Sequence, residues 1–212
     1  MYIPSHFDEK RPEVMHGLIR SHGFGALVTL GGDGLNANHI PFEIDPTPSD
    51  AAPFGTLRAH VARANPVWRD FSPDVDAMVL FQGAQAYITP SWYETKKTDG
   101  KVVPTYNYMV VHAYGKVQAI EDAAWLRALV GRLTDRYEAS RAAPWKVDDA
   151  PADYIEKMLS AIVGIEIPVT RMLGKWKVSQ NRPGVDRAGV VAGLQELGTD
   201  DAVAMAAAVK QS

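Results

Sequence analysis

Polar side chains interrupt otherwise apolar, strand-like stretches between Phe54 and Gly115. They are Arg58, His60, Gln82, Gln85, Asn107 and His112. Burying a polar group costs free energy unless it finds a partner, so strands that only fill a core do not need these residues. Aromatic residues are interleaved with them, namely Tyr87, Trp92, Tyr93, Tyr106 and Tyr108. This combination predicts a pocket for a flat, polar and anionic ligand.

One end of this region has the residue types of an anion site. In the string LRAHVARANP, Arg58 and His60 are two residues apart, so they lie on one face of a strand. Arg63 follows, and Asn65 before Pro66 is typical of a helix start. Cations beside a helix N-terminus suit a phosphate group. Surface cations and an ordinary N-cap explain the same residues, and both interpretations stay open.

Amide side chains suggest the flat part of the ligand. Four of them fall in strand-like segments or at strand ends: Gln82, Gln85, Asn107 and Gln180. Each amide offers a donor and an acceptor, as the edge of an isoalloxazine or a nucleobase requires. Trp92, Tyr106 and Trp176 could pack on the face of such a ring, although core packing also accounts for strand aromatics.

The segment GKWKVSQNRPG at 174–184 is basic and rich in amides just ahead of an expected helix. It contains Lys177, Gln180 and Asn181. These residues could close the pocket or meet a partner subunit, and a solvated strand end with an N-cap is the other interpretation.

Several other kinds of chemistry lack their sequence patterns. The chain has 212 residues and no cysteine, which excludes disulfides and thiolate chemistry. The histidines have no metal-binding spacing, so no metal site is predicted. Phosphate loops of the GxxxxGK[ST] and GxGxxG types are absent, as is GxSxG. A net charge of −3 argues against a nucleic-acid binder. The charged N-terminus does not resemble a signal peptide, and a cytoplasmic location is expected.

The elements that must position these residues are mainly strands, with most helices late in the chain. Periodicity and turn residues predict helices over 12–22, 122–137, 152–161 and 183–210, the last broken at Gly198. Strands are expected over 24–30, 35–44, 55–61, 76–82, 84–89, 102–120 and 163–179. Short connections favour antiparallel pairing, so the prediction is a mainly β, α+β fold: a small barrel with helices packed outside.

Several long strings in the chain resemble the PaiB-type family of FMN-binding negative transcriptional regulators. They include MYIPSHF, LNANHIPF, GTLRAHVARANPVW, FQGAQAYITPSWY, KVVPTYNYMVVHAYG and GKWKVSQNR. The resemblance covers about residues 1–195, expected to form one FMN-binding domain, and leaves 196–212 as a helical C-terminal tail. It implies the six-stranded antiparallel split β-barrel of the pyridoxamine-phosphate oxidase-like flavoproteins. It also implies a homodimer with FMN at the subunit interface.

Carried onto this sequence, the resemblance places the two ends of FMN. The phosphate is expected near Arg58, His60, Arg63 and Asn65. The ring is expected near Gln85, Tyr87, Ser91 and Trp92, with Asn107, Lys177, Gln180 and Asn181 completing the site.

Four functions remain open at this stage. The first is an FMN-binding protein with a regulatory or redox-linked role, and the second is an FMN-dependent oxidoreductase or flavin reductase that uses a nicotinamide cofactor. The third is a repressor that binds DNA directly, for which the helix DAVAMAAAVK offers few base-reading side chains. The fourth is a haem-binding variant of the barrel, with His60 or His112 as the ligand.

Overall fold

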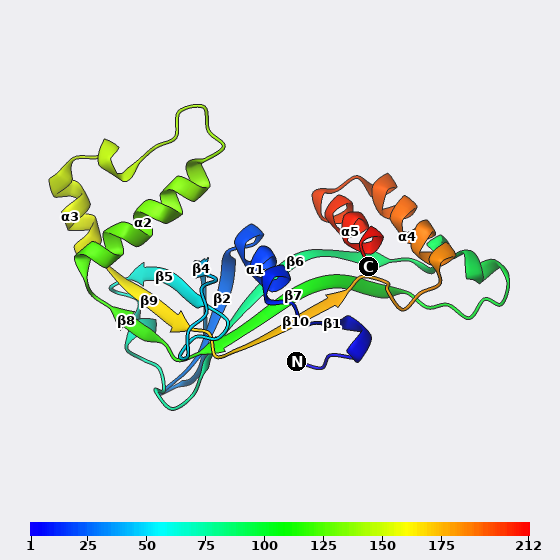
Figure 1. Ribbon diagram of the computed structural model, residues 1–212, viewed down its shortest axis with the longest axis horizontal. Coiled ribbons are helices and arrows are strands. Elements are labelled where there is room, and N and C mark those ends of the chain that lie inside the picture. The colour runs from blue at the N-terminus through cyan, green and yellow to red at the C-terminus, as the bar shows by residue number, and fades with distance from the viewer. The chain divides into compact units, whose positions relative to one another are not determined.

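The computed structural model describes residues 1–212 as an α+β chain (Figure 1). The helices are α1 (Pro12–Ser21), α2 (Ala123–Glu138), α3 (Ala152–Ser160), α4 (Gly184–Leu197) and α5 (Asp200–Lys210). The strands are β1 (Asp8–Glu9), β2 (Phe24–Gly31), β3 (Gly34–Pro41), β4 (Glu43–Asp45), β5 (Thr56–Ala62), β6 (Ala77–Ile88), β7 (Thr105–Gly115), β8 (Gln118–Ile120), β9 (Ile162–Pro168) and β10 (Arg171–Lys177). Short 3₁₀ helices include η2 (Pro66–Trp68), η3 (Pro90–Trp92) and η4 (Glu94–Lys97).

The strands form two sheets. One has six strands in the order β1-β10-β7-β6-β2-β3, and the other has four in the order β4-β5-β9-β8. The pairs β2–β3, β4–β5 and β5–β9 are antiparallel, as their short connections predict. The prediction of an antiparallel α+β fold is therefore confirmed.

The chain divides into two compact units. The first comprises residues 1–21, 82–111 and 173–212, and the second comprises 22–81 and 112–172. None of the helices is long and apolar enough to cross a membrane.

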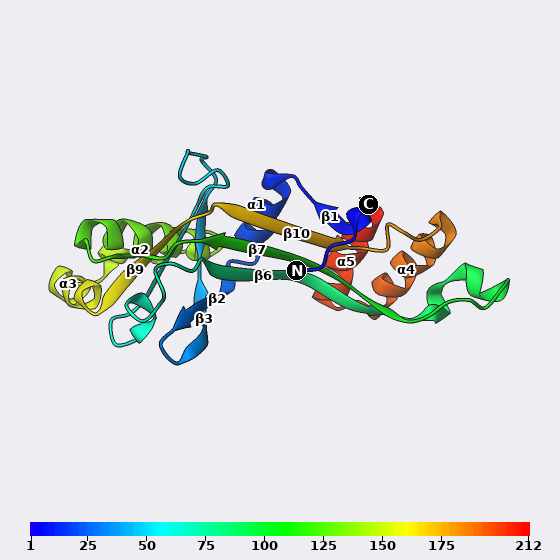
Figure 2. The same cartoon turned by 90° about the horizontal axis from the view of Figure 1, so that it is seen from below.

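The core of the first unit joins the two C-terminal helices to strand residues. Ile88, Val178, Val190, Leu194 and Met205 are all buried in it. Gly198 has φ of 64° and ends α4, and Thr199 then caps α5 by accepting a hydrogen bond from Ala202 N at 3.3 Å. Figures 1 and 2 both show α4 and α5 side by side. The predicted boundary at 195 lies within α4, and α5 packs on α4.

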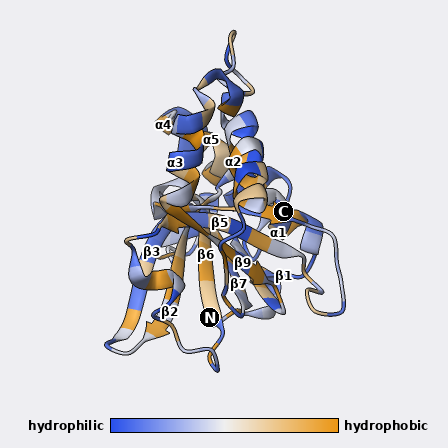
Figure 3. Ribbon diagram, turned by 90° about the vertical axis from the view of Figure 1, so that its left-hand side faces the viewer, coloured by the Kyte–Doolittle hydropathy of each residue, from blue (hydrophilic) through white to orange (hydrophobic).

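The core of the second unit is built from alternating strand residues. Leu57, Ala59 and Val61 of β5 are buried, while the residues between them are half-buried. Strand β9 pairs with β5 from Thr56↔Pro168 to Ala62↔Ile162, and its Val163, Ile165 and Ile167 are buried as well. Figure 3 shows hydrophobic colour on β9 and hydrophilic stretches on α2 and α3.

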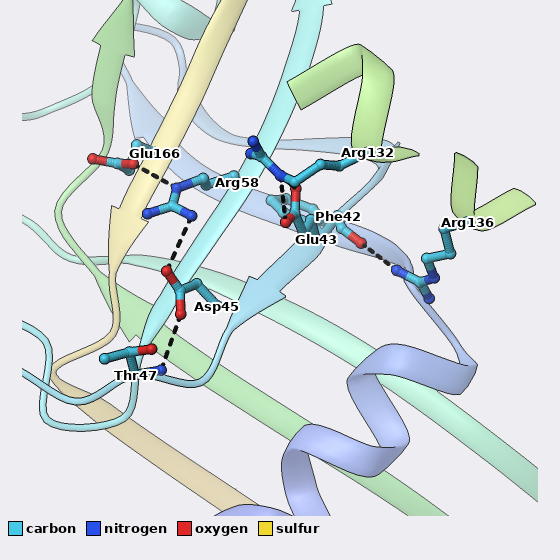
Figure 4. Close-up of polar contacts among 8 residues, drawn as sticks. All are labelled: Phe42, Glu43, Asp45, Thr47, Arg58, Arg132, Arg136 and Glu166. Carbon is cyan, nitrogen blue, oxygen red and sulfur yellow. Dashed lines mark hydrogen bonds and ion pairs between the residues drawn. The ribbon is translucent and has the colours of Figure 1, made fainter. Parts of the chain in front are cut away.

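Helix α2 begins as its sequence predicts. Asp122 Oδ1 accepts a hydrogen bond from Trp125 N at 2.7 Å, which satisfies one free N–H of the first turn. Leu126, Leu129 and Leu133 are buried on one face. Arg132 of α2 donates through its Nε to both carboxylate oxygens of Glu43, at 2.8 and 3.0 Å. These bonds fix α2 against β4 (Figure 4).

Strand β6 changes its buried face at Gly83. Up to that point the odd-numbered residues 77, 79, 81 and 83 are buried, and beyond it Ala84 and Ile88 are buried instead. Such a shift by one residue is typical of a β-bulge. Gly83 is also a close-approach point, because a Cβ there would lie 3.0 Å from Leu18 Cδ1. The shift leaves Gln85 and Tyr87 on the exposed side of the strand.

Candidate functional site

Arg58 lies on β5 within a network of carboxylates in the second unit (Figure 4). Its Nε donates to Glu166 Oε2 at 2.8 Å, and its Nη1 donates to Asp45 Oδ2 at 3.2 Å. Burial acts to lower the pKa of Arg58, but the two carboxylates outweigh it and raise the pKa above its usual value. Thr47 N donates to Asp45 Oδ1 at 3.1 Å. This hydrogen bond, together with the nearby charge of Arg58, lowers the pKa of Asp45. A phosphate would therefore compete with two carboxylates for this guanidinium.

His60 lies on the same face of β5 as Arg58, as the alternation predicts. Its Nδ1 is buried and has no hydrogen-bond partner in the protein. Burial lowers the pKa of His60, which favours a neutral ring at pH 7. A neutral imidazole is a weaker partner for phosphate than a cation.

Arg63 and Asn65 follow β5 and are already engaged with the protein. Arg63 donates to the backbone oxygens of Ser160 and Ile162, at 2.9 and 3.2 Å, and forms an ion pair with Glu121. Asn65 Oδ1 accepts from Val67 N at 3.0 Å, so Asn65 is the N-cap that the sequence predicts. Its Nδ2 donates to Asn38 Oδ1 at 2.8 Å.

The ring-binding candidates meet at a cavity in the first unit. The cavity has a volume of about 380 Å³ and is lined by Gln85, Ala86, Tyr87, Thr89, Trp92, Leu197, Thr199 and Ala202. Three of these residues, Gln85, Tyr87 and Trp92, were predicted to hold the ring. Ser91 is adjacent, and its backbone N–H donates to Thr89 Oγ1 at 3.2 Å. Cavities of this size, with few polar groups on aromatic walls, typically take small molecules.

Two glycines of α4 hold Trp92 in place. A Cβ on Gly189 would lie 1.9 Å from Trp92 O, and a Cβ on Gly193 would lie 2.1 Å from Trp92 Cε2. Both distances are shorter than any real carbon contact, so the indole and its backbone lie directly on the glycine face of α4. The lack of a side chain at these two positions of α4 thus fixes the wall of the cavity that Trp92 forms.

Asn107 is buried on β7 and is bonded to an unusual serine. Its Nδ2 donates to Ser179 Oγ at 2.8 Å, whereas its Oδ1 is buried without a partner. Ser179 is also buried and has φ of 64°, a left-handed conformation that is costly for a residue other than glycine. The strained serine therefore positions the amide and leaves its carbonyl without a hydrogen-bond partner.

Lys177, at the end of β10, lies close to Tyr106. Its Nζ donates to Tyr106 O at 2.6 Å and to Thr105 Oγ1. Burial, followed by the charges of Lys175 and Arg182, lowers the pKa of Lys177. The Tyr106 ring is 6.2 Å from that of Tyr87, in an edge-to-face arrangement.

Gln180 and Asn181 are not part of this cavity. The Gln180 side chain closes its own turn, accepting from Val178 N at 2.8 Å and donating to Trp176 O. Gln180 and Trp176 line a different cavity of the same unit, of about 440 Å³, together with Glu9, Arg11 and residues of α5. Asn181 is exposed next to this turn.

The predicted residues thus form separate groups. Arg58, His60, Arg63 and Asn65 lie in the second unit, and the other eight lie in the first. Glu166 and Asp45 were missed, because no local pattern predicts partners far along the chain. Thr199 and Leu197, from the predicted tail, also reach the cavity. The string LGTDD, a helix stop followed by an N-cap, is the signal that could have drawn attention to Thr199.

The two sheets and their order define a split-barrel α+β fold. A solved structure with this fold, described as the FAD and heme binding protein from Mycobacterium smegmatis, matches with a TM-score of 0.59 at 14% identity. The match covers 80% of this chain and 73% of that one.

The chain belongs to the PaiB-type family described as "Putative FMN-binding domain", which matches residues 1–171. It is 34% identical over 206 residues to the protease synthase and sporulation protein PAI 2 of Bacillus subtilis, covering 97% of this chain and 95% of that protein. It is also 34% identical over 254 residues to an uncharacterised protein of Aspergillus fumigatus, covering 100% of this chain and 97% of the relative. The predicted family is therefore confirmed.

Proposed function

We propose that this protein binds FMN and acts as a cytoplasmic, FMN-dependent regulatory or redox-linked protein. The observation that carries the proposal is the cavity lined by Gln85, Tyr87 and Trp92 in a member of an FMN-binding family. When bound, FMN would supply electron-transfer chemistry, while the protein binds and orients it.

The residues in the first unit fit the flavin ring. Tyr87 and Trp92 offer aromatic surfaces, and the exposed amide of Gln85 offers both a donor and an acceptor. Asn107 Oδ1 is buried and lacks a partner, so an N–H on the ring edge would satisfy it. Lys177 adds a cation. Burial lowers the pKa of Lys177 and so disfavours its charged form, which an electron-rich ring nearby would stabilise.

The phosphate is proposed to bind near Arg58, His60, Arg63 and Asn65. Arg63 is the more accessible arginine, with 38% of its side chain exposed against 23% for Arg58. Both arginines now contact carboxylates, so phosphate binding must rearrange Glu166, Asp45 or Glu121.

Titration with FMN and with riboflavin separates the two ends, since riboflavin lacks the phosphate. The double variant Arg58→Ala, Arg63→Ala should bind FMN more weakly, by roughly 1.5–3 kcal/mol for each lost charge-assisted bond, and riboflavin unchanged. Trp92→Ala should weaken both ligands. Arg127→Ala, which removes an exposed arginine on α2, is the matched control. Equal FMN affinity in the double variant and the control would reject the phosphate site.

The regulatory part of the proposal draws on the name of PAI 2, a protease synthase and sporulation protein. Helix α5 carries only Lys210 as a basic residue, so an indirect effect on gene expression fits the chain better than direct reading of DNA bases. If the FMN-loaded protein oxidised NADH or NADPH steadily, its function would be that of an oxidoreductase and not the regulatory one.

We further propose a homodimer with FMN at the subunit interface. Light scattering on the protein with and without FMN tests this, and a monomer at micromolar concentration in both states would contradict it.

A further inference from the structure

Another cavity, of about 380 Å³, lies in the second unit where α2 packs near β5. It is lined by Pro41, His60, Val130, Leu133, Thr134, Tyr137, Glu138 and Trp145. Apart from His60, none of these residues was predicted to contact FMN. Its volume falls in the usual range for small-molecule sites.

His60, which lines this cavity, has a ring nitrogen with an unmet hydrogen bond. His60 Nδ1 is inaccessible to water and bonds to no group of the protein. Buried polar atoms without a partner are uncommon and call for an explanation such as a ligand. Because burial lowers the pKa of His60, the ring is neutral near pH 7 and can accept a hydrogen bond through one nitrogen.

Two aromatic side chains of the cavity are exposed, and contacts fix the Tyr137 ring and the Trp145 backbone. Tyr137 is 52% exposed and Trp145 is 45% exposed. The Arg136 guanidinium lies 5.3 Å from the Tyr137 ring centre, and Arg136 Nη1 is anchored on Phe42 O at 3.3 Å (Figure 4). Trp145 N donates to Glu138 Oε2 at 3.2 Å. The aromatic surfaces are thus arranged in advance for a flat ligand.

The lining carries almost no net charge. It contains no lysine or arginine, and its only carboxylate, Glu138, forms an ion pair with Arg141 at 3.5 Å. An anion would find no cation in the cavity, and a cation would find a carboxylate that is already paired. The chemistry therefore favours a neutral ligand.

We propose that this cavity binds a small, flat, uncharged aromatic molecule whose hydroxyl group donates to the neutral imidazole of His60 and whose ring lies against Tyr137 and Trp145. Its lining shares no residue with the cavity proposed for the flavin ring. It gives the protein a second ligand, of phenol-like chemistry, whose site shares only His60 with the proposed phosphate site.

Phenol and toluene form a matched pair of probes, since they have similar shapes but only phenol carries a hydroxyl. NMR titration of the isotope-labelled protein should show phenol shifting the resonances of His60, Tyr137 and Trp145. Phenol should bind about three- to tenfold more tightly than toluene, the ratio expected for one net hydrogen bond. His60→Phe should abolish this preference.

Variants of the aromatic walls test the site without touching His60. Tyr137→Ala and Trp145→Ala should each weaken phenol binding about two- to tenfold, as expected for loss of one aromatic contact. FMN affinity should stay unchanged in both. Tyr154→Ala is the control, because Tyr154 is 53% exposed on α3 in the same unit and does not line the cavity.

Three results would overturn the proposal. The first is that phenol does not bind at about 10 mM, a concentration at which weakly binding fragments are readily detected. The second is that the phenol-induced shifts persist in Tyr137→Ala and Trp145→Ala, and the third is that FMN or riboflavin shifts the resonances of Tyr137 and Trp145. The last result would assign the cavity to the flavin and leave FMN binding itself intact. The variants are compared only after their melting temperatures show that they fold, and the exposed Tyr137 makes its variant the safest.

Discussion

Replacing Gly193 with alanine should displace Trp92 and distort the ring-binding cavity. A Cβ at this position would lie 2.1 Å from Trp92 Cε2 and 2.3 Å from both Cδ2 and Nε1. Carbon atoms in contact prefer roughly 3.5–4 Å, so the indole must shift by more than about 1 Å. Trp92 is also confined by Gly189, whose added Cβ would meet Trp92 O.

Gly131 supplies a matched control for the size of this effect. It lies inside α2, and a Cβ there would meet nothing within 4 Å. Alanine is favoured over glycine in a helix interior by about 1 kcal/mol, so Gly131→Ala should stabilise the protein by that amount. The same gain applies to Gly193→Ala, but overpacking of a core contact costs about 1–3 kcal/mol, and the severe overlap favours the upper end. The two variants should therefore differ by about 3 kcal/mol in their free energies of unfolding.

Urea denaturation and thermal melting measure this difference directly. For a chain of this size, 1 kcal/mol corresponds to about 2–4 °C, so Gly193→Ala should melt about 6–12 °C below Gly131→Ala. FMN affinity should fall in Gly193→Ala and remain unchanged in Gly131→Ala. If the two variants have equal stability and equal FMN affinity, Trp92 does not lie on α4 as described and the reasoning fails.

Three further predictions concern buried polar groups. The unfolded chain binds a proton at His60 below pH about 6.5, whereas burial lowers the pKa of His60 in the folded state, so stability should fall as the pH falls from 7 to 5. His60→Gln should lose less stability over the same range, and urea midpoints at both pH values check this. Ser179→Ala should lower the free energy of unfolding by about 1–3 kcal/mol, because Asn107 Nδ2 loses its acceptor; an unchanged urea midpoint would contradict this. Buried Asp186 accepts from Thr95 N and Oγ1, at 2.9 and 2.8 Å, so Asp186→Ala should release the basic segment after Thr95. Trypsin should then cleave there faster than in the wild type, and equal rates would argue that other contacts hold the segment.

Local patterns were enough to predict much of the fold. Asp122 caps α2, Asn65 caps η2, and Arg58 and His60 share a face of β5, each as its sequence neighbours indicate. These features depend on residues within a few positions of each other, where capping and alternation act.

The contacts that the site residues make could not be predicted from local patterns. Arg58 was expected to be available for phosphate, yet its partner Glu166 is 108 residues away in the chain. The position of Trp92 depends on glycines of α4, which in the sequence look like ordinary helix interruptions. These contacts are set by tertiary packing, and a single sequence carries no local record of them.

The shift of buried residues at Gly83 makes backbone conformation, rather than residue type, the determinant of one cavity wall. Without the bulge, simple alternation along β6 would turn Gln85 and Tyr87 toward the core, with Ile88 facing outward. No side chain near the cavity would have been replaced, yet its amide and its phenol would both be removed. Relatives whose strand passes this point without a bulge should therefore differ in what they bind, even where the flanking residues are identical.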